Sequence, residues 1–180
     1  MRVITGKYKG RHFDVPRSFK ARPTTDFAKE NIFNVLRSYT DFENQTVLDI
    51  FAGTGSISLE FLSRGCSRVV SIEIDRQHCA FLRTLFQKLG DPASCLLHAD
   101  ALRYLSKPTE TFDIVFADPP YTLRELPSLP ELVLQGDVLK PEGLFILEHG
   151  SSNDFSKHPF FMEHRVYGSV NFTIFRKHAQ

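Results

Sequence analysis

The sequence predicts an α/β protein with a doubly wound, seven-stranded sheet that is mostly parallel. From residue 46 onward, short apolar runs suited to buried strands alternate with segments of helical periodicity. Strand–helix–strand repeats of this kind build parallel sheets with helices on both faces. The chain has 180 residues, 42% of them hydrophobic, which is enough for one globular domain with a sizeable core.

The N-terminal segment differs from the rest of the chain in charge. Residues 1–22 contain seven Lys or Arg and one acid, Asp14, a net charge of +6; the rest contains 15 basic and 20 acidic side chains, a net charge of −5. The pattern of residues 2–15 predicts a small β-hairpin around a basic turn. We therefore divide the chain into a basic hairpin and arm, 1–22, and a doubly wound domain, 23–180. A basic arm favours a polyanionic partner such as nucleic acid, although a solubilising tail has the same composition.

The remaining elements follow in chain order. A helix is expected to start at Thr25 or Asp26, residue types that cap helices, and to continue to residue 36. Strands are expected at residues 46–52, 68–74, 94–99, 112–117 and 144–149. Helices are expected between them at about 56–64, 76–89, 101–106 and 126–136, with glycine at the helix ends at Gly65, Gly90 and Gly136. The tail predicts an antiparallel hairpin from segments 164–170 and 171–177.

The first strand runs into the sequence Asp-Ile-Phe-Ala-Gly-Thr-Gly, residues 49–55. Glycines between a strand and a helix let the backbone approach a ligand at the helix N-terminus. Glu73 ends the next strand, at the position from which an acid accepts hydrogen bonds from ribose hydroxyls. A tight turn followed by a solvated acid is the alternative interpretation, but the combination favours a nucleotide site.

The same segment indicates which nucleotide binds. The dinucleotide pattern G-x-G-x-x-G is not met, because Ser58 stands at the third glycine position. Asp49 would repel a pyrophosphate but suits the ammonium group of S-adenosylmethionine, directly or through water. Asp100 is placed to accept from the adenine amine, the Ala101 N–H to donate to the ring, and Ile74 to pack on the purine. Asp100 is equally suited to cap the next helix, and both interpretations stay open.

The fourth strand ends in Asp118-Pro119-Pro120-Tyr121. Asp118 has three possible roles: a helix cap, a metal ligand, or an acceptor for a substrate amine. The nearest other acids lie on a polar segment further along, so we expect no metal. The Asp118 carboxylate and the Pro119 carbonyl can both accept N–H hydrogens of a planar amine, while Tyr121 stacks on a flat substrate. The prolines restrict the backbone and carry no competing N–H.

Taken together, these motifs resemble those of class I, Rossmann-fold methyltransferases that act on amino groups. The N-terminal pattern Gly6-x-x-x-Gly10-Arg11, followed by Arg22-Pro-Thr-Thr-Asp26 and Asn31-Ile-Phe-Asn34, resembles the RsmD-type bacterial 16S ribosomal RNA guanine-N2 methyltransferases, which modify guanine 966. The resemblance extends from residue 1 to the closing hairpin. It implies methyl transfer from S-adenosylmethionine to the N2 of a guanine in 16S rRNA, free or in a partly assembled 30S subunit.

The resemblance also implies roles for individual residues. Cofactor binding falls to Asp49, Phe51, Gly53, Gly55, Glu73, Asp100 and Ala101, with Thr25 near the methionine end. It implies that Asp118, Pro119 and Tyr121 bind the target base. It also implies that the RNA is contacted by Arg22 and by the basic hairpin with Lys7, Lys9 and Arg11. The chain departs from the family after the Asp-Pro-Pro-Tyr motif, where residues 123–129 replace a long loop.

Other functions keep the same fold. A DNA adenine-N6 methyltransferase is one alternative, but we expect no DNA-recognition domain in this chain. A protein glutamine methyltransferase is another, but its motif usually begins with Asn rather than with an acid such as Asp118, and the basic arm does not suit a small peptide. A non-catalytic binding module would not need acids at three strand ends. Three unpaired cysteines (Cys66, Cys79 and Cys95), scattered histidines and no long apolar run lead us to expect a cytoplasmic monomer without a metal or a membrane partner.

Overall fold

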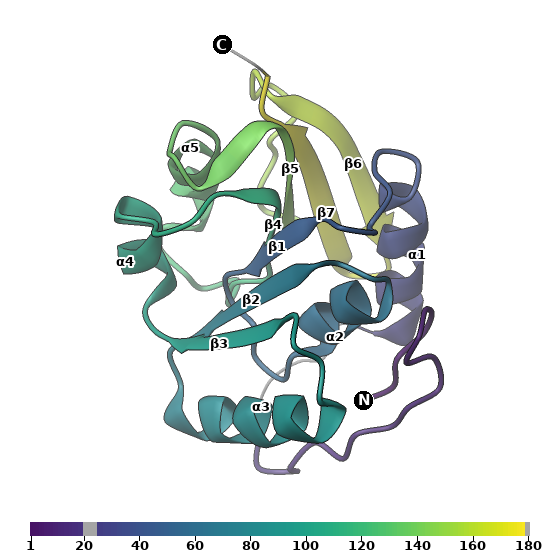
Figure 1. Ribbon diagram of the computed structural model, residues 1–180. Coiled ribbons are helices and arrows are strands. Elements are labelled where there is room, and N and C mark those ends of the chain that lie inside the picture. Colours follow the sequence, from purple (N-terminus) through teal and green to yellow (C-terminus); the bar gives the residue numbers. More distant parts are fainter. Residues whose placement is uncertain (20–24, 179–180) are drawn as a thin grey trace.

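The computed structural model describes residues 1–19 and 25–178, and it confirms the α/β architecture (Figure 1). One seven-stranded sheet has the order β3-β2-β1-β4-β5-β7-β6. Its strands are β1 (Thr46–Asp49), β2 (Arg68–Glu73), β3 (Ser94–His98), β4 (Phe112–Ala117), β5 (Leu139–His149), β6 (Phe161–Tyr167) and β7 (Val170–Arg176). The first five strands are parallel, and β7 pairs antiparallel with both β5 and β6.

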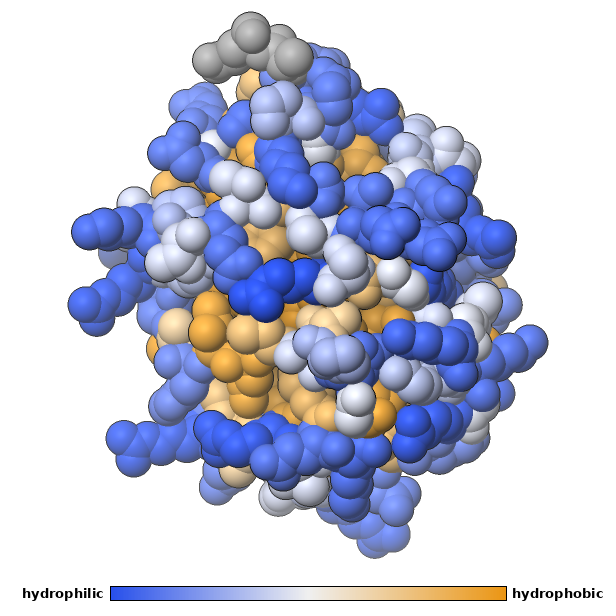
Figure 2. Space-filling view, in the orientation of Figure 1, coloured by the Kyte–Doolittle hydropathy of each residue, from blue (hydrophilic) through white to orange (hydrophobic). Residues whose placement is uncertain are grey.

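Helices cover both faces of the sheet, as the prediction of a doubly wound fold requires (Figure 1). One face packs against α1 (Asp26–Leu36), α2 (Ser56–Ser63) and α3 (Arg76–Leu89), and the other against α4 (Ala101–Ser106), the 3₁₀ turn η1 (Leu126–Ser128) and α5 (Leu129–Leu134). Within the described residues, no helix is long and apolar enough to cross a membrane. The edge strand β3 is mostly half-buried, and hydrophobic side chains are visible in that part of the surface in Figure 2.

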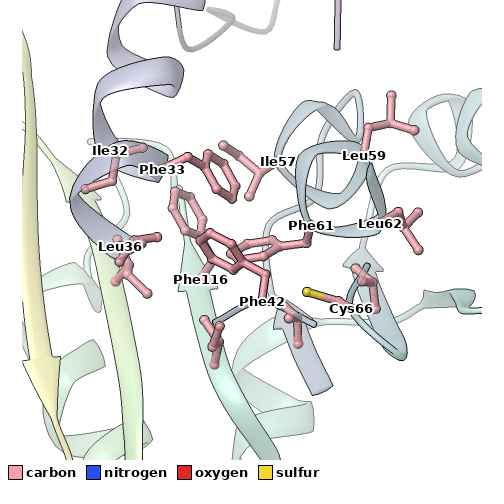
Figure 3. Packing of buried hydrophobic residues seen from close by; sticks show 14 of the residues in the cluster. Ile32, Phe33, Leu36, Phe42, Ile57, Leu59, Phe61, Leu62, Cys66 and Phe116 are labelled. Carbon is pink, nitrogen blue, oxygen red and sulfur yellow. The ribbon is translucent and has the colours of Figure 1, made fainter. Parts of the chain in front are cut away.

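An aromatic cluster joins α1 and α2 to the central strand β4. Alternate residues of β4 face opposite sides of the sheet, so Phe116 points toward these helices while Val115 packs on the α4–α5 side. The Phe61 ring lies edge-on to Phe33, with centroids 4.8 Å apart, and contacts Phe116 at 6.3 Å. Figure 3 shows these rings pointing toward one another. The cluster therefore positions the strand that immediately precedes Asp118.

Several element boundaries differ from the prediction. The first strand ends at Asp49 rather than at residue 52, and β5 begins at Leu139, where Phe112 pairs with it, rather than at residue 144. The helix predicted over 126–136 is split into η1 and α5, because prolines in this stretch lack the N–H that a continuous helix needs. In the closing hairpin β6 starts at residue 161, and the turn lies at Gly168, whose φ of 64° favours glycine.

The predicted N-terminal hairpin is not a regular one. A single antiparallel bridge pairs Arg2 with His12, and no extended ladder follows it within residues 1–19. Backbone bonds still join its two arms: the Val3 N–H donates to the Arg11 carbonyl at 3.0 Å, and the Phe13 N–H donates to the Met1 carbonyl at 2.9 Å. The segment also bonds to α2, where the Ile4 N–H donates to Glu60 Oε1 at 2.7 Å and the Lys7 N–H donates to the Ser63 carbonyl at 2.8 Å. The segment is thus a short, irregular hairpin docked on α2, called the N-terminal loop below. The domain boundary at residue 22 lies outside the described residues and stays a prediction.

A buried ion pair joins this N-terminal loop to α1 and α2. Lys29 and Glu60 are 1% and 0% exposed, and Lys29 Nζ lies 3.3 Å from Glu60 Oε1. The ammonium group also donates to the Arg2 carbonyl at 2.7 Å and to Ser56 Oγ at 3.0 Å, and Glu60 accepts in addition from Arg64. These bonds offset the cost of burying both charges.

Removal of the Lys29 ammonium is expected to destabilise the fold strongly. Lys29→Met leaves the Glu60 carboxylate buried without this partner, so the free energy of unfolding should fall by about 3–5 kcal/mol. Urea denaturation followed by circular dichroism measures the loss. Lys140→Met is the matched control, because its pair with Asp113 at 2.9 Å is partly exposed and should contribute about 1 kcal/mol or less. Equal losses in the two variants would contradict the assignment.

Candidate functional site

The carboxyl ends of the parallel strands border a cleft of about 700 Å³. Parallel strands end at a common edge, and doubly wound sheets bind their ligands there. The cleft is lined by seven of the nine predicted cofactor residues and by all three predicted substrate residues: Asp49, Phe51, Gly53, Glu73, Ile74, Asp100, Ala101, Asp118, Pro119 and Tyr121. Residues that are distant in sequence are thus brought together as the sequence predicted.

Asp49 is a buried carboxyl group in the wall of this cleft. It is 1% exposed and accepts a hydrogen bond from Ser58 Oγ at 2.7 Å; Ser58 in turn bonds to the Ser71 hydroxyl. Burial raises the pKa of Asp49 to about 7, and the nearby charge of Glu73 adds to this, while the Ser58 bond opposes it. A cation bound beside Asp49 would favour its charged form, so the site suits a positively charged group.

Glu73 is held in one orientation by two backbone N–H groups. Its Oε2 accepts from Gly53 N–H and its Oε1 from Asp75 N–H, both at 2.8 Å. Each carboxylate oxygen has a second lone pair and can also accept from a ligand hydroxyl. Gly53 therefore serves the site by aiming its N–H at Glu73, with a φ of 53° that favours glycine.

Two predicted cofactor residues do not line the cleft. Gly55 caps α2 with a φ of 78°, a left-handed conformation that favours glycine, and a Cβ there would lie 2.5 Å from Leu82 Cδ2. Thr25 caps α1, where its hydroxyl accepts from the Ala28 N–H at 3.1 Å. Cofactor contact by either residue stays a prediction.

The cap interpretation of Asp100 is confirmed, and its contact with adenine stays a prediction. Its Oδ1 accepts from the Arg103 N–H at 2.8 Å and so caps α4, and the residue also lines the cleft. Ala101 begins α4, where the backbone N–H has no partner within the helix. Ile74 is 62% exposed, which leaves its apolar side chain available to a flat ligand.

The motif after β4 is joined to a residue that sequence reasoning missed. The Tyr121 hydroxyl donates to Glu148 Oε1 at 3.0 Å, and a Cβ added at Gly150 would lie 3.3 Å from the Tyr121 ring. Glu148 belongs to β5, is 4% exposed and lines the cleft. The sequence feature that could have identified Glu148 as a site residue is its position as an acid near the end of a strongly apolar strand. His78, which also lines the cleft and contacts the Phe19 ring, was likewise missed.

The predicted RNA-binding residues lie away from the cleft or outside the described residues. Lys7 pairs with Asp91 at 2.9 Å near Ser63, at the end of α2 that points away from the cleft. The Arg11 guanidinium lies over the rings of Tyr8 and Phe13. Lys9 is exposed in the same loop, and Arg22 lies outside the described residues. RNA contact by these four residues remains a prediction.

The fold is that of the class I methyltransferases. A precorrin-6y C5,15-methyltransferase from Geobacter metallireducens shares it with a TM-score of 0.72 at 19% identity, over 93% of this chain and 94% of that one. The Escherichia coli structure yhhF matches with a TM-score of 0.87 at 29% identity, over 100% and 99% of the two chains.

The chain belongs to the family whose model is described as Conserved hypothetical protein 95, which matches residues 1–176. Several relatives are named ribosomal RNA small subunit methyltransferase D. The one from Haemophilus influenzae is 33% identical over 152 residues, which is 82% of this chain and 78% of the relative. The one from Escherichia coli K12 is 30% identical over 183 residues, which is 100% and 91%. The family resemblance inferred from the motifs is thus confirmed.

The raised pKa of Asp49 predicts a pH-dependent stability. Between about pH 4 and pH 7 the folded state holds the Asp49 proton more tightly than the unfolded state, so this group's contribution to stability is lost as pH rises through that window. Asp49→Asn should therefore be more stable than the parent at pH 8, by at most on the order of 4 kcal/mol. Urea unfolding at pH 4 and pH 8 checks this, with the difference vanishing at pH 4. A variant less stable than the parent at pH 8 would refute it.

Proposed function

We propose that this chain transfers a methyl group from S-adenosylmethionine to the exocyclic N2 amine of a guanine in 16S ribosomal RNA, of the guanine 966 type. The observation that carries the proposal is that Asp49, Glu73 and Asp118, from three strand ends, line one cleft. The relatives named ribosomal RNA small subunit methyltransferase D support an rRNA substrate. We expect the enzyme to act as a monomer.

The residues of the cleft fit S-adenosylmethionine. Asp49 would hold the ammonium group of its methionine part, and Glu73, already oriented by two N–H groups, would accept from the ribose hydroxyls. Ile74 would cover the adenine, with Asp100 and the Ala101 N–H at the ring edge. When bound, the cofactor supplies an electrophilic methyl group on a sulfonium centre. A cleft of about 700 Å³ is within the range of small-molecule sites.

The Asp-Pro-Pro-Tyr segment would act on the amine. The lone pair of an exocyclic amine is delocalised into the ring, which makes the nitrogen a poor nucleophile. Asp118 and the Pro119 carbonyl accept its two hydrogens and orient the lone pair out of the base plane. The methyl group would pass from the sulfonium sulfur, which keeps the electron pair of the broken C–S bond, to the nitrogen, and the nitrogen would lose one proton to Asp118 or to water. Tyr121, whose hydroxyl is anchored on Glu148, offers its ring to the base.

The RNA would approach at the carboxyl edge of the sheet. Among the described residues five large hydrophobic side chains are exposed, and four belong to this edge: Phe27, Ile74, Tyr121 and Val166. Phe27 contacts the Tyr167 ring edge-on at 6.1 Å, beside the β6–β7 turn. Exposed rings of this kind stack on unpaired bases. The basic N-terminal loop would then contact a second part of a large folded RNA.

Labelling with tritiated S-adenosylmethionine tests the reaction and the substrate together. Naked 16S rRNA and 30S particles are incubated with the enzyme, and the labelled nucleosides are identified after digestion. N2-methylguanosine is the expected product. N6-methyladenosine, or label that enters neither RNA, would overturn the proposal.

Asp118 is expected to be essential for turnover but not for cofactor binding. Asp118→Ala removes one of the two amine acceptors, so kcat should fall by at least about 100-fold. The Kd for S-adenosylmethionine, measured by calorimetry, should change by no more than a few-fold, since the cofactor contacts come from other strands. A fully active variant would show that the carboxylate does not act on the amine.

Phe27 is expected to contribute to RNA affinity. Phe27→Ala removes an exposed ring and should weaken RNA binding by about 1–3 kcal/mol, the value of one base stacked on an aromatic side chain. Filter binding or fluorescence anisotropy at fixed salt measures the change. Leu132→Ala is the matched control: this leucine is also exposed but lies on α5. Similar affinities for the two variants would place the RNA elsewhere.

A further inference from the structure

The roles described above give Glu148 no task toward the substrate; Asp75, which also lines the cleft, caps α3. Glu148 lines the cleft together with Asp118 and is 4% exposed. In the parallel pairing of β4 with β5, Ala117 lies opposite Leu147, so the next residues along the two strands are Asp118 and Glu148. Neighbouring strands are about 4.8 Å apart. The sheet thus places two acids side by side at the substrate end of the cleft.

The orientation of Glu148 is set by the residue that is expected to hold the base. Its Oε1 accepts from the Tyr121 hydroxyl at 3.0 Å. A carboxylate has two oxygens with about four lone-pair positions, so it can accept from a ligand as well as from the Tyr121 hydroxyl. Burial makes this acceptor selective, because an acceptor in a cleft is costly to leave facing another acceptor.

The pattern of donors on guanine matches two adjacent acids. Guanine presents its N2 amine next to N1–H, so two donors stand side by side on one edge. Adenine and cytosine present an amine next to a ring nitrogen that is an acceptor. Among the bases with an exocyclic amine, guanine alone therefore satisfies a second acceptor placed beside the first.

We propose that Glu148 is a specificity-determining residue that accepts the N1–H of the target guanine, while Asp118 and the Pro119 carbonyl accept from its N2 amine. This inference rests on the proposed function, because it takes guanine N2 as the reacting group. It adds the basis for choosing guanine, which an Asp-Pro-Pro-Tyr motif alone leaves open, since that motif recognises only an amine.

A purely structural role for Glu148 makes a different prediction. If the carboxylate only held Tyr121, its loss would lower activity by the same factor on every base that carries the reacting amine. A role in reading N1–H instead changes the ratio between two bases that differ at N1. The discriminating base is 2-aminopurine, which keeps the 2-amino group but has an acceptor at N1.

The experiment compares kcat/KM on two RNAs that carry guanine or 2-aminopurine at the target position. The parent is expected to prefer guanine by at least about 100-fold, since sites built for a donor reject analogues that lack it. In Glu148→Gln the amide can donate to N1, so the preference should fall at least about 10-fold. The missing O6 of 2-aminopurine affects both enzymes alike and cancels in this comparison.

Two further variants keep the test decisive. Glu125→Gln makes the same chemical change at an exposed acid in the loop after Tyr121 and should leave the preference unchanged. Glu148→Asp retains the carboxylate and should keep the preference for guanine, which covers the case in which Glu148→Gln does not fold.

The outcomes separate the two levels of the proposal. An unchanged preference in Glu148→Gln, or a lost preference in Glu148→Asp, overturns the specificity role while the methyltransferase function stands. A parent that forms no N2-methylguanosine on the guanine RNA overturns the proposed function itself.

Discussion

The parallel arrangement of the central strands is the constraint on which the site depends. The β1 strand pairs in parallel with both β2 and β4, so the acids at their ends, Asp49, Glu73 and Asp118, reach the same edge of the sheet. Parallel pairing requires long crossovers, and the helices that supply them cover both faces and bury the strands. The site is therefore a consequence of the sheet, and the cleft lies where the helices leave the strand ends open.

Buried charge has two different uses in this molecule. The Lys29–Glu60 pair is fully partnered and ties the N-terminal loop and α1 to Ser56, which begins α2 and lines the cleft. Asp49 is buried beside hydroxyl groups, and burial raises its pKa to about 7. The first arrangement stabilises the wall of the cleft, and the second favours binding of a cationic ligand.

Local sequence signals predicted the helices and strands whose ends are set by residues close to them in the sequence. Asp75 caps α3 and Gly90 ends it in the left-handed conformation, and the observed helix has the predicted ends. Predictions of regularity and of element ends were wrong where these depend on residues that are distant in the sequence. The N-terminal segment folds back on itself as predicted, but its hairpin is irregular, because the N–H groups of Ile4 and Lys7 donate to Glu60 and Ser63 of α2. The early start of β5 likewise depends on pairing with Phe112, which no local pattern shows.

The sequence by itself determined the α/β class, the family and the set of residues at the strand ends. Apolar runs, glycines and prolines have this effect because they restrict the conformation of residues close to them in the chain. Only the tertiary structure decided that Glu148 and Asp118 line the same cleft, that Lys7 is paired with Asp91, and that Gly55 lies against Leu82. Strand order and ion pairing join residues far apart in the chain, and their energies depend on neighbours that only the folded sheet brings into contact.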